Sequence, residues 1–223
     1  MPGIDHIDGD TSQEESTGAG EDHYRAPLAE QHGEEEIQVA HVGKLTQLNG
    51  PVYLADYDDE WPRLFEREAE RVRTALGDRV LLLEHVGSTS VPGLAAKPKI
   101  DMLLVVADSA DELAYVPDLE KAGYVLHIRE PDWHQHRMFK GPDTDINLHI
   151  YTSGCSEIGR LLLFRNWLCS NTSDRLLYEH TKRELACRDW KYMQNYADAK
   201  TVVVEEILAR TQKNAQEVRM GDE

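Results

Sequence analysis

The residues best suited to chemistry gather in one stretch, between His85 and Asp101. A hydrophobic run ends at Gly87-Ser88-Thr89, and Asp101 opens the next hydrophobic run. Glycine allows a tight turn and the close approach of a ligand, and hydroxyl and backbone N–H donors together can cradle phosphate oxygens. Aspartate is depleted in strands and costly to bury alone, so Asp101 requires a metal ion, a lysine or water. We expect a phosphate loop beside a cation-binding carboxylate; the alternative is an ordinary turn and a solvated strand end.

Basic side chains near this stretch could bind phosphate. Lys97 and Lys99 flank Pro98, which stiffens the loop, and they could contact phosphate or neutralise Asp101. Arg165 has a planar fork of donors that suits phosphate or carboxylate. For Arg165 the competing interpretation is a structural salt bridge between helices.

Two predicted strands add acidic and imidazole side chains. In the strand 145–151, Asp145, Asn147 and His149 alternate with Ile146, Leu148 and Ile150, so they share one face. If this strand neighbours Asp101, we expect Asp145 and His149 to join it as metal ligands, and Asp145 as a catalytic base. In the strand 80–86 only one of Glu84 and His85 can face the same site, and Glu84 is a third candidate base. A sheet with one wet face is the alternative.

The surrounding pattern predicts the elements that position these residues. Helical spacing marks residues 59–76, and Ser109 with Glu112 has the pattern of a capping box for a helix toward Ala122. Further strands are expected at 100–106, 124–128 and 137–140, and helices at 157–168, 174–188 and 193–212. The order is typical of an α/β (α+β) fold, a mixed sheet followed by a helical half.

Composition sets further expectations. The net charge is −17, and residues 1–40 contain eleven acidic residues against one arginine. A segment so acidic and poor in large apolar residues cannot offset its ordering entropy, so we expect residues 1–48 to be a disordered tail and 49–223 to be the folded domain. The acidic balance argues against nucleic-acid binding. Three cysteines lack metal-ligand spacing, and no run has transmembrane length, which predicts a cytoplasmic protein without membrane contact.

The stretch from His85 to Asp101 resembles the signature of the GrpB family, whose fold is similar to that of polymerase-β-like nucleotidyltransferases. Similar matches occur across residues 51–210, at Tyr57-Asp58 with Trp61, Arg137 with Phe139-Lys140, Leu148-His149, Phe164–Leu168, and Tyr178, Lys182, Tyr196 and Lys200. The resemblance implies that Gly87 and Ser88 form the phosphate loop, that Asp101 is the first acid of a Mg²⁺ (or Mn²⁺) site, and that Lys182 and Lys200 reach the triphosphate of ATP or another NTP. In the wider superfamily a second acid stands two residues after the first, and that position is Leu103 in this chain.

Three functions remain open from the sequence. The first is NTP- and metal-dependent nucleotidyl transfer to a small molecule, which with a carboxylate acceptor would make the protein an adenylating ligase. The second, favoured by Leu103, is a nucleotide- or metabolite-binding protein of the same fold without catalysis. The third is an interaction module whose acidic tail recruits a basic partner. The expected site residues are Asp101, Asp145 and Glu84 for catalysis, Gly87, Ser88, Thr89, Lys97, Lys99, Arg165, Lys182 and Lys200 for the nucleotide, and Asp101, His149 and Asp145 for the metal.

Overall fold

A five-stranded mixed sheet forms the centre of the protein in a computed structural model that describes residues 31–221, with side chains up to Asn214. The strands lie in the order β1-β2-β5-β4-β3, and only the β2–β5 pair is parallel. Their bounds are β1 (Leu82–Val86), β2 (Ile100–Val106), β3 (Val125–Glu130), β4 (His136–Lys140) and β5 (Ile146–Thr152). The predicted mixed α/β fold is confirmed.

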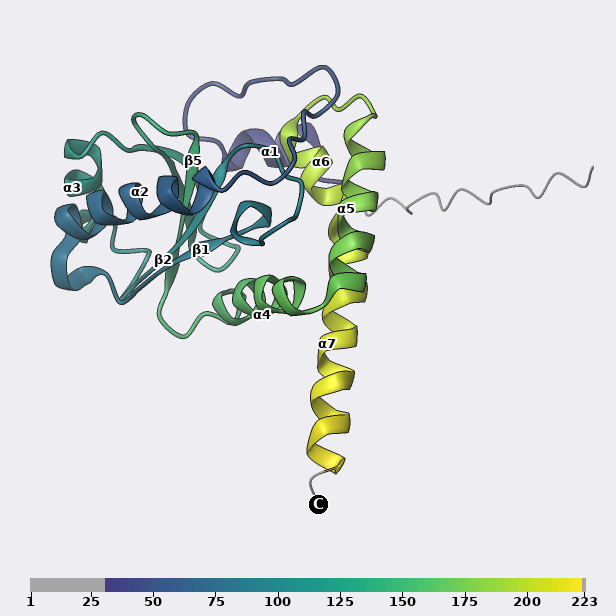
Figure 1. The fold of residues 1–223 in the computed structure, drawn as a ribbon. Coiled ribbons are helices and arrows are strands. Elements are labelled where there is room, and N and C mark those ends of the chain that lie inside the picture. The colour runs from purple at the N-terminus through teal and green to yellow at the C-terminus, as the bar shows by residue number, and fades with distance from the viewer. Residues whose placement is uncertain (1–30, 222–223) are drawn as a thin grey trace, which may run out of the picture.

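The two faces of the sheet have different partners (Figure 1). Ile146, Leu148 and Ile150 alternate onto one face, where they are fully buried in a core with α2 (Glu60–Leu76) and α3 (Val116–Lys121). The opposite face carries Leu103 and Tyr151 against α4 (Ser156–Ser170). Alternation therefore leaves Asp101, Asn147 and His149 on the α4 face, since paired residues in adjacent strands share a face.

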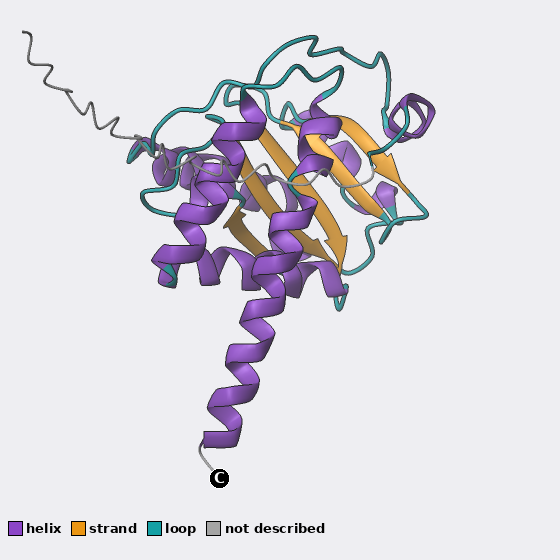
Figure 2. Ribbon diagram, turned by 90° about the vertical axis from the view of Figure 1, so that its right-hand side faces the viewer, coloured by secondary structure: helices purple, strands orange, loops and turns teal. Residues whose placement is uncertain are grey.

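Three more helices, α5 (Thr172–Ala186), α6 (Met193–Ala199) and α7 (Thr201–Gly221), complete the helical half. The side chain of Asn171 accepts a hydrogen bond from the backbone N–H of Asp174 and caps α5. The single helix predicted over 193–212 is instead two helices with Lys200 at the break. Figure 2 shows α7 continuing beyond the body of the domain. No helix in the described residues is long and apolar enough to cross a membrane.

The segment before residue 49 is more ordered than its composition predicts. Residues 1–30 lie outside the described part of the chain, but 31–48 fold onto the domain, with α1 (Glu34–Ala40) burying Ile37. The Asp198 carboxylate accepts from the backbone N–H of His32, and the Glu34 carboxylate accepts from the Tyr192 hydroxyl, 2.6 Å away. The predicted boundary at residue 48 therefore lies too late, because His32 and Glu34 have specific partners on α6 and at the residue just before it.

The helix predicted from Ser109 also begins later. Ser109 is fully buried and its hydroxyl donates to the carbonyl of Gln135 rather than capping a helix. A 3-10 turn spans Glu112–Ala114, and α3 starts at Val116 with Pro117 in its first turn, where proline's missing N–H costs nothing.

Candidate functional site

Gly87 brings the loop after β1 against the carboxylate of Asp101. The register pairs Val86 with Asp101, so the loop leaves β1 beside the start of β2. Gly87 has φ 70°, and a Cβ built there would lie 2.6 Å from Asp101 Oδ2. Only glycine tolerates both this backbone conformation and this contact. The sequence-predicted proximity of Gly87, Ser88 and Asp101 is thus a consequence of local geometry.

Asp101 is held as an anion by its neighbours. Asn147 Nδ2 donates to Oδ1 at 2.7 Å, and His149 Nε2 lies 3.7 Å from the same oxygen. Burial alone would raise the pKa of Asp101, but His149, Lys97 and Asn147 outweigh burial and lower the pKa to about 2. The side chain keeps 30% of its surface exposed, so it remains within reach of a ligand.

Three lysines from different segments lie near the loop or Asp101: Lys182 contacts the loop, and Lys97 and Lys200 interact with the charge of Asp101. Lys182 on α5 is 2% exposed; its ammonium donates to Ser88 Oγ at 3.0 Å and to the carbonyl of Ala95. The same ammonium lies 4.8 Å from the ring centroid of Tyr178, one helical turn earlier. Lys97 and Lys200 lie 5.8 and 4.9 Å from the Tyr196 ring. We call Gly87, Ser88, Lys97, Asp101, Lys182 and Lys200 the Asp101 site.

The charge of Lys200 destabilises the charged forms of the other two lysines. Burial lowers the pKa of Lys97 to about 8, with the charge of Lys200 as the next cause. Burial and the charge of Lys200 hold the pKa of Lys182 well below its usual value. Burial also lowers the pKa of Lys200, although the charge of Asp101 opposes it. An anion placed among them would relieve both effects, since opposite charge favours the ammonium form.

Several predicted members of the site are bound to other groups. Asp145 precedes β5 opposite Lys99 and forms an ion pair with it, which follows from the pairing of Ile100 with Ile146. Glu84 accepts from Arg165 at 2.7 Å, and Arg165 also donates to the carbonyl of His85. The structure thus contains a salt bridge for Arg165, but the bridge joins α4 to β1 rather than two helices.

Thr89 stabilises the loop from inside. It is 1% exposed; its hydroxyl donates to the carbonyl of Lys99 and lies 3.0 Å from His85 Nε2. His85 in turn stacks on Phe65 with ring centroids 4.9 Å apart. Through these contacts Thr89 and His85 support the loop. Ser88, which is half-buried, supplies the loop hydroxyl on the side of the lysines.

The predicted metal set does not assemble. Asp101 and His149 are neighbours, but Asp145 is paired with Lys99, and Leu103 is fully buried where a second acid would stand. Across residues 31–221 no group of three or more His, Cys, Asp or Glu side chains is arranged to hold a metal ion. The donors present do not fit a two-metal site.

Four neighbours of the site are residues that the sequence patterns contain but that were not predicted as site residues. Lys140 donates to Asn147 Oδ1, and burial lowers the pKa of Lys140 to about 8. Asn147 links that lysine to Asp101. Tyr178 and Tyr196 lie four residues before Lys182 and Lys200. That repeated spacing is the signal that could have found them, because residues four apart on a helix face each other.

A chain of polar side chains crosses the sheet behind Asp101. Glu130 Oε2 lies 2.6 Å from His136 Nδ1, and His136 Nε2 lies 3.0 Å from His149 Nδ1. His136 is 5% exposed; its burial lowers its pKa to about 4 despite Glu130. This chain fixes the ring of His149 next to Asp101.

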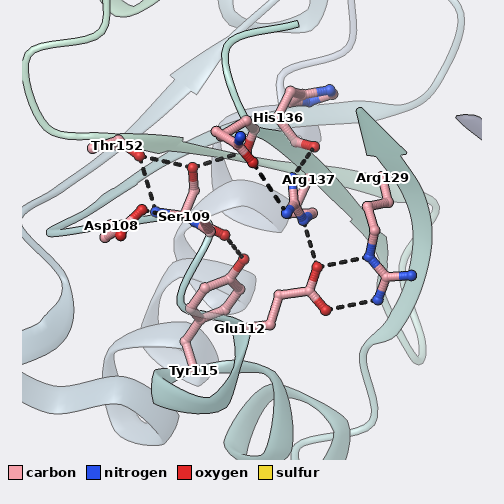
Figure 3. Close-up of polar contacts among 10 residues, drawn as sticks. Asp108, Ser109, Glu112, Tyr115, Arg129, His136, Arg137 and Thr152 are labelled. Carbon is pink, nitrogen blue, oxygen red and sulfur yellow. Dashed lines mark hydrogen bonds and ion pairs between the residues drawn. The ribbon is translucent and has the colours of Figure 1, made fainter. Parts of the chain in front are cut away.

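A second polar cluster lies at the other end of β2, around Glu112 (Figure 3). Its carboxylate accepts two hydrogen bonds from Arg129 and one from Arg137, at 2.6–2.7 Å. The hydrogen bonds from Arg129 are the largest cause that lowers the pKa of Glu112 to about 2. Arg137 is 4% exposed and also donates to the carbonyl of His136. These groups satisfy one another, so the cluster is structural.

Two hollows lie away from the Asp101 site. The larger, about 320 Å³, lies between α4, α5 and α7 beside Trp167 and Arg210. The smaller, about 20 Å³, lies beside Ile37 and Ile128.

Comparison with known proteins places this architecture in a family. A UPF0157 protein of Halalkalibacterium halodurans is 60% identical over 79% of this chain and 91% of its own. The crystal structure of GrpB from Enterococcus faecalis matches with a TM-score of 0.63 and 31% identity, over 74% of this chain and 99% of that chain. A protein of Mycolicibacterium paratuberculosis named dephospho-CoA kinase is 32% identical over 66% of this chain, but the match spans 43% of that protein. The family described as GrpB protein matches residues 51–210, and the chain belongs to the GrpB family.

Proposed function

We propose that this protein binds a nucleotide or another phosphate-bearing small molecule at the Asp101 site. The observation that carries the proposal is the contact of Lys182 with Ser88, together with Lys97 and Lys200, whose charges interact with that of Asp101 beside the same loop. Phosphate oxygens accept from ammonium, hydroxyl and backbone N–H donors, and charge-assisted hydrogen bonds are the strong ones. The relative named dephospho-CoA kinase agrees in ligand class, but the shared region is less than half of that protein.

Nucleotidyl transfer to a small-molecule acceptor, including adenylation followed by ligation, is the second candidate. The ionised carboxylate of Asp101 beside a phosphate loop favours it. With a pKa of about 2, however, Asp101 is a weak proton acceptor at neutral pH. Glu84 is occupied by Arg165, and Asp145 by Lys99. The predicted role of Mg²⁺ or Mn²⁺ lacks the second carboxylate, so binding has more support than transfer.

Thermal unfolding in the presence of each of the four NTPs, with metal and with EDTA, tests the proposal. A ligand that binds the folded state raises the melting temperature, and at ten times Kd it adds about 1.4 kcal/mol to the free energy of unfolding. If none of the four NTPs at millimolar concentration raises the melting temperature in either buffer, the proposal is refuted. Release of pyrophosphate from the bound NTP, with an acceptor extract present, would raise transfer above binding.

A further inference from the structure

We propose that the Asp101 site holds a polyphosphate directly on Lys97, Lys182 and Lys200, without a divalent cation. This inference rests on the proposed function and names what supplies the positive charge. Three observations support it: the state of the one carboxylate at the site, the partners of the other acids, and the contacts of the lysines.

The carboxylate of Asp101, although 30% exposed, has protein neighbours on both oxygens, which a metal ion would have to share. Its Oδ1 accepts from Asn147, and its Oδ2 faces Gly87, where even a methyl group would approach within 2.6 Å. Asn147 presents its Nδ2 donor to Asp101, while its Oδ1 accepts from Lys140. Mg²⁺ requires near-octahedral oxygen ligands at about 2.0–2.1 Å. Both oxygens of Asp101 are therefore already in contact with the protein.

Neither Glu84 nor Asp145 can supply a second acid in place of Leu103 without breaking an ion pair. Leu103 is fully buried against α4. Glu84, its partner in the β1–β2 register, receives the guanidinium of Arg165. Asp145 receives the ammonium of Lys99. The basic residues thus neutralise the acids that a metal site would need.

The ammonium groups of these lysines, in contrast, make their direct contacts with neutral groups, and the charge of Asp101 acts on Lys97 and Lys200. The ammonium of Lys182 donates to Ser88 Oγ and the carbonyl of Ala95, that of Lys97 contacts Met193 Sδ, and that of Lys200 lies over the Tyr196 ring. Buried or half-buried ammonium groups that repel one another are stabilised by a multivalent anion. Positive charge from the chain itself therefore replaces the charge that a metal ion would bring to the phosphates.

Isothermal titration of the full-length protein with ATP, and separately with inorganic tripolyphosphate, tests this inference in excess EDTA and in excess Mg²⁺. Since Mg²⁺ neutralises part of the charge on ATP, affinity in EDTA should equal or exceed that in Mg²⁺. Binding of ATP only when Mg²⁺ is present would overturn the inference and leave the proposed function standing. Absence of binding in both buffers would overturn both.

Charge-removing variants locate the anion. Lys97→Met and Lys200→Met should each weaken ATP binding in EDTA roughly tenfold, the value of one charge-assisted hydrogen bond. Lys97→Arg should retain most of the affinity. Lys121→Met, at the exposed end of α3, is the matched control and should bind as the parent does. Equal affinities for the Lys97, Lys200 and Lys121 variants, with unchanged melting temperatures, would place the ligand elsewhere and overturn the inference.

Lys182→Met tests the deepest lysine of the site. The change removes a buried charge and keeps the length of the side chain, but it leaves the Ala95 carbonyl without its donor, so the melting temperature without ligand should fall modestly. ATP affinity in EDTA should fall by about tenfold or more, because Lys182 is fixed on Ser88. Unchanged affinity in a variant that unfolds normally would contradict the assignment. If this variant fails to fold, the Lys97 and Lys200 variants still decide the question.

Discussion

At the scale of single residues, Gly87 is the position at which backbone geometry and a close neighbour most directly require one residue type. We expect Gly87→Ala to lower the free energy of unfolding by about 2 kcal/mol or more, the sum of positive-φ strain and a steric contact. Gly93 is the matched control: its φ is 77°, but a Cβ there meets nothing within 4 Å, so Gly93→Ala should cost about 1 kcal/mol. Urea unfolding of both variants measures the difference. Equal losses would show that the contact with Asp101 is unimportant.

The Asp101→Asn variant separates a metal ligand from a charge partner of the lysines. The pKa of Asp101 falls from 3.8 to about 2 on folding. Its carboxylate therefore contributes stability that is present above about pH 4 and is lost as pH falls toward 2, an amount of at most about 2 kcal/mol. The variant should unfold at lower temperature at pH 7. ATP affinity in EDTA should be unchanged or higher, because a negative charge beside the phosphates is gone. A tenfold loss of ATP affinity in Mg²⁺ buffer, with affinity in EDTA unchanged, would argue for a metal ligand.

Residue types and spacing sufficed to bring Gly87, Ser88 and Asp101 together, because a loop and the strand after it are neighbours in the chain. Residue types and spacing did not suffice to predict the partners of Asp145 and Glu84. Which cation each carboxylate meets depends on the register of β2 against β5 and on the approach of α4 to β1. Those arrangements follow from tertiary packing, so sequence reasoning could name the acids but could not pair them.

At the scale of elements, the segment around α1 shows where composition misleads. Ile37 is 4% exposed and Val39, on the same short helix, is 81% exposed. Ile37→Ala should lower the free energy of unfolding by about 2 kcal/mol, at the low end for a buried aliphatic residue because α1 is peripheral. Val39→Ala should change it by less than about 0.5 kcal/mol. If the two variants unfold alike, α1 does not contribute to the stability of the domain.

Elements with a strong hydrophobic period were predictable, and their junctions were not. The predicted strand 100–106 coincides with β2, and the predicted helix 59–76 differs from α2 by one residue. The break between α6 and α7 falls at Lys200, where neither glycine nor proline marks it. Packing of α6 against α5 and the segment before residue 49 decides the break, and the break brings Lys200 to the Asp101 site.

At the scale of the whole molecule, net charge and local charge have opposite signs. The chain carries −17, yet the Asp101 site concentrates three ammonium groups around one carboxylate. A small anion responds to the local potential at short range, since charges farther away than about 10 Å are screened at physiological salt. A nucleic acid would meet the acidic surface as well. The molecule as a whole therefore suits a small phosphate-bearing ligand better than a long polyanion.

The pH dependence of stability is also a property of the whole molecule, because it sums over three histidines. Burial lowers the pKa of His85, His127 and His136 from 6.5 to about 4. Above pH 6.5 each ring is neutral in both states and the full stability is present. As pH falls from 6.5 toward 4, these histidines bind protons in the unfolded chain while they stay neutral in the folded chain. The free energy of unfolding therefore falls by about 1–2 kcal/mol per histidine by pH 5.

Unfolding with urea at pH 7.5 and pH 5 measures that loss. His136→Asn should reduce the difference between the two pH values by about 1–2 kcal/mol, because one of the three rings no longer takes up a proton on unfolding. His180→Asn, at an exposed position on α5, is the matched control and should leave the difference unchanged. A difference that stays the same in the His136 variant would mean that this ring is already protonated in the folded protein. Its contacts with Glu130 and His149 would then hold an imidazolium, and the chain of side chains leading to Asp101 would carry a positive charge.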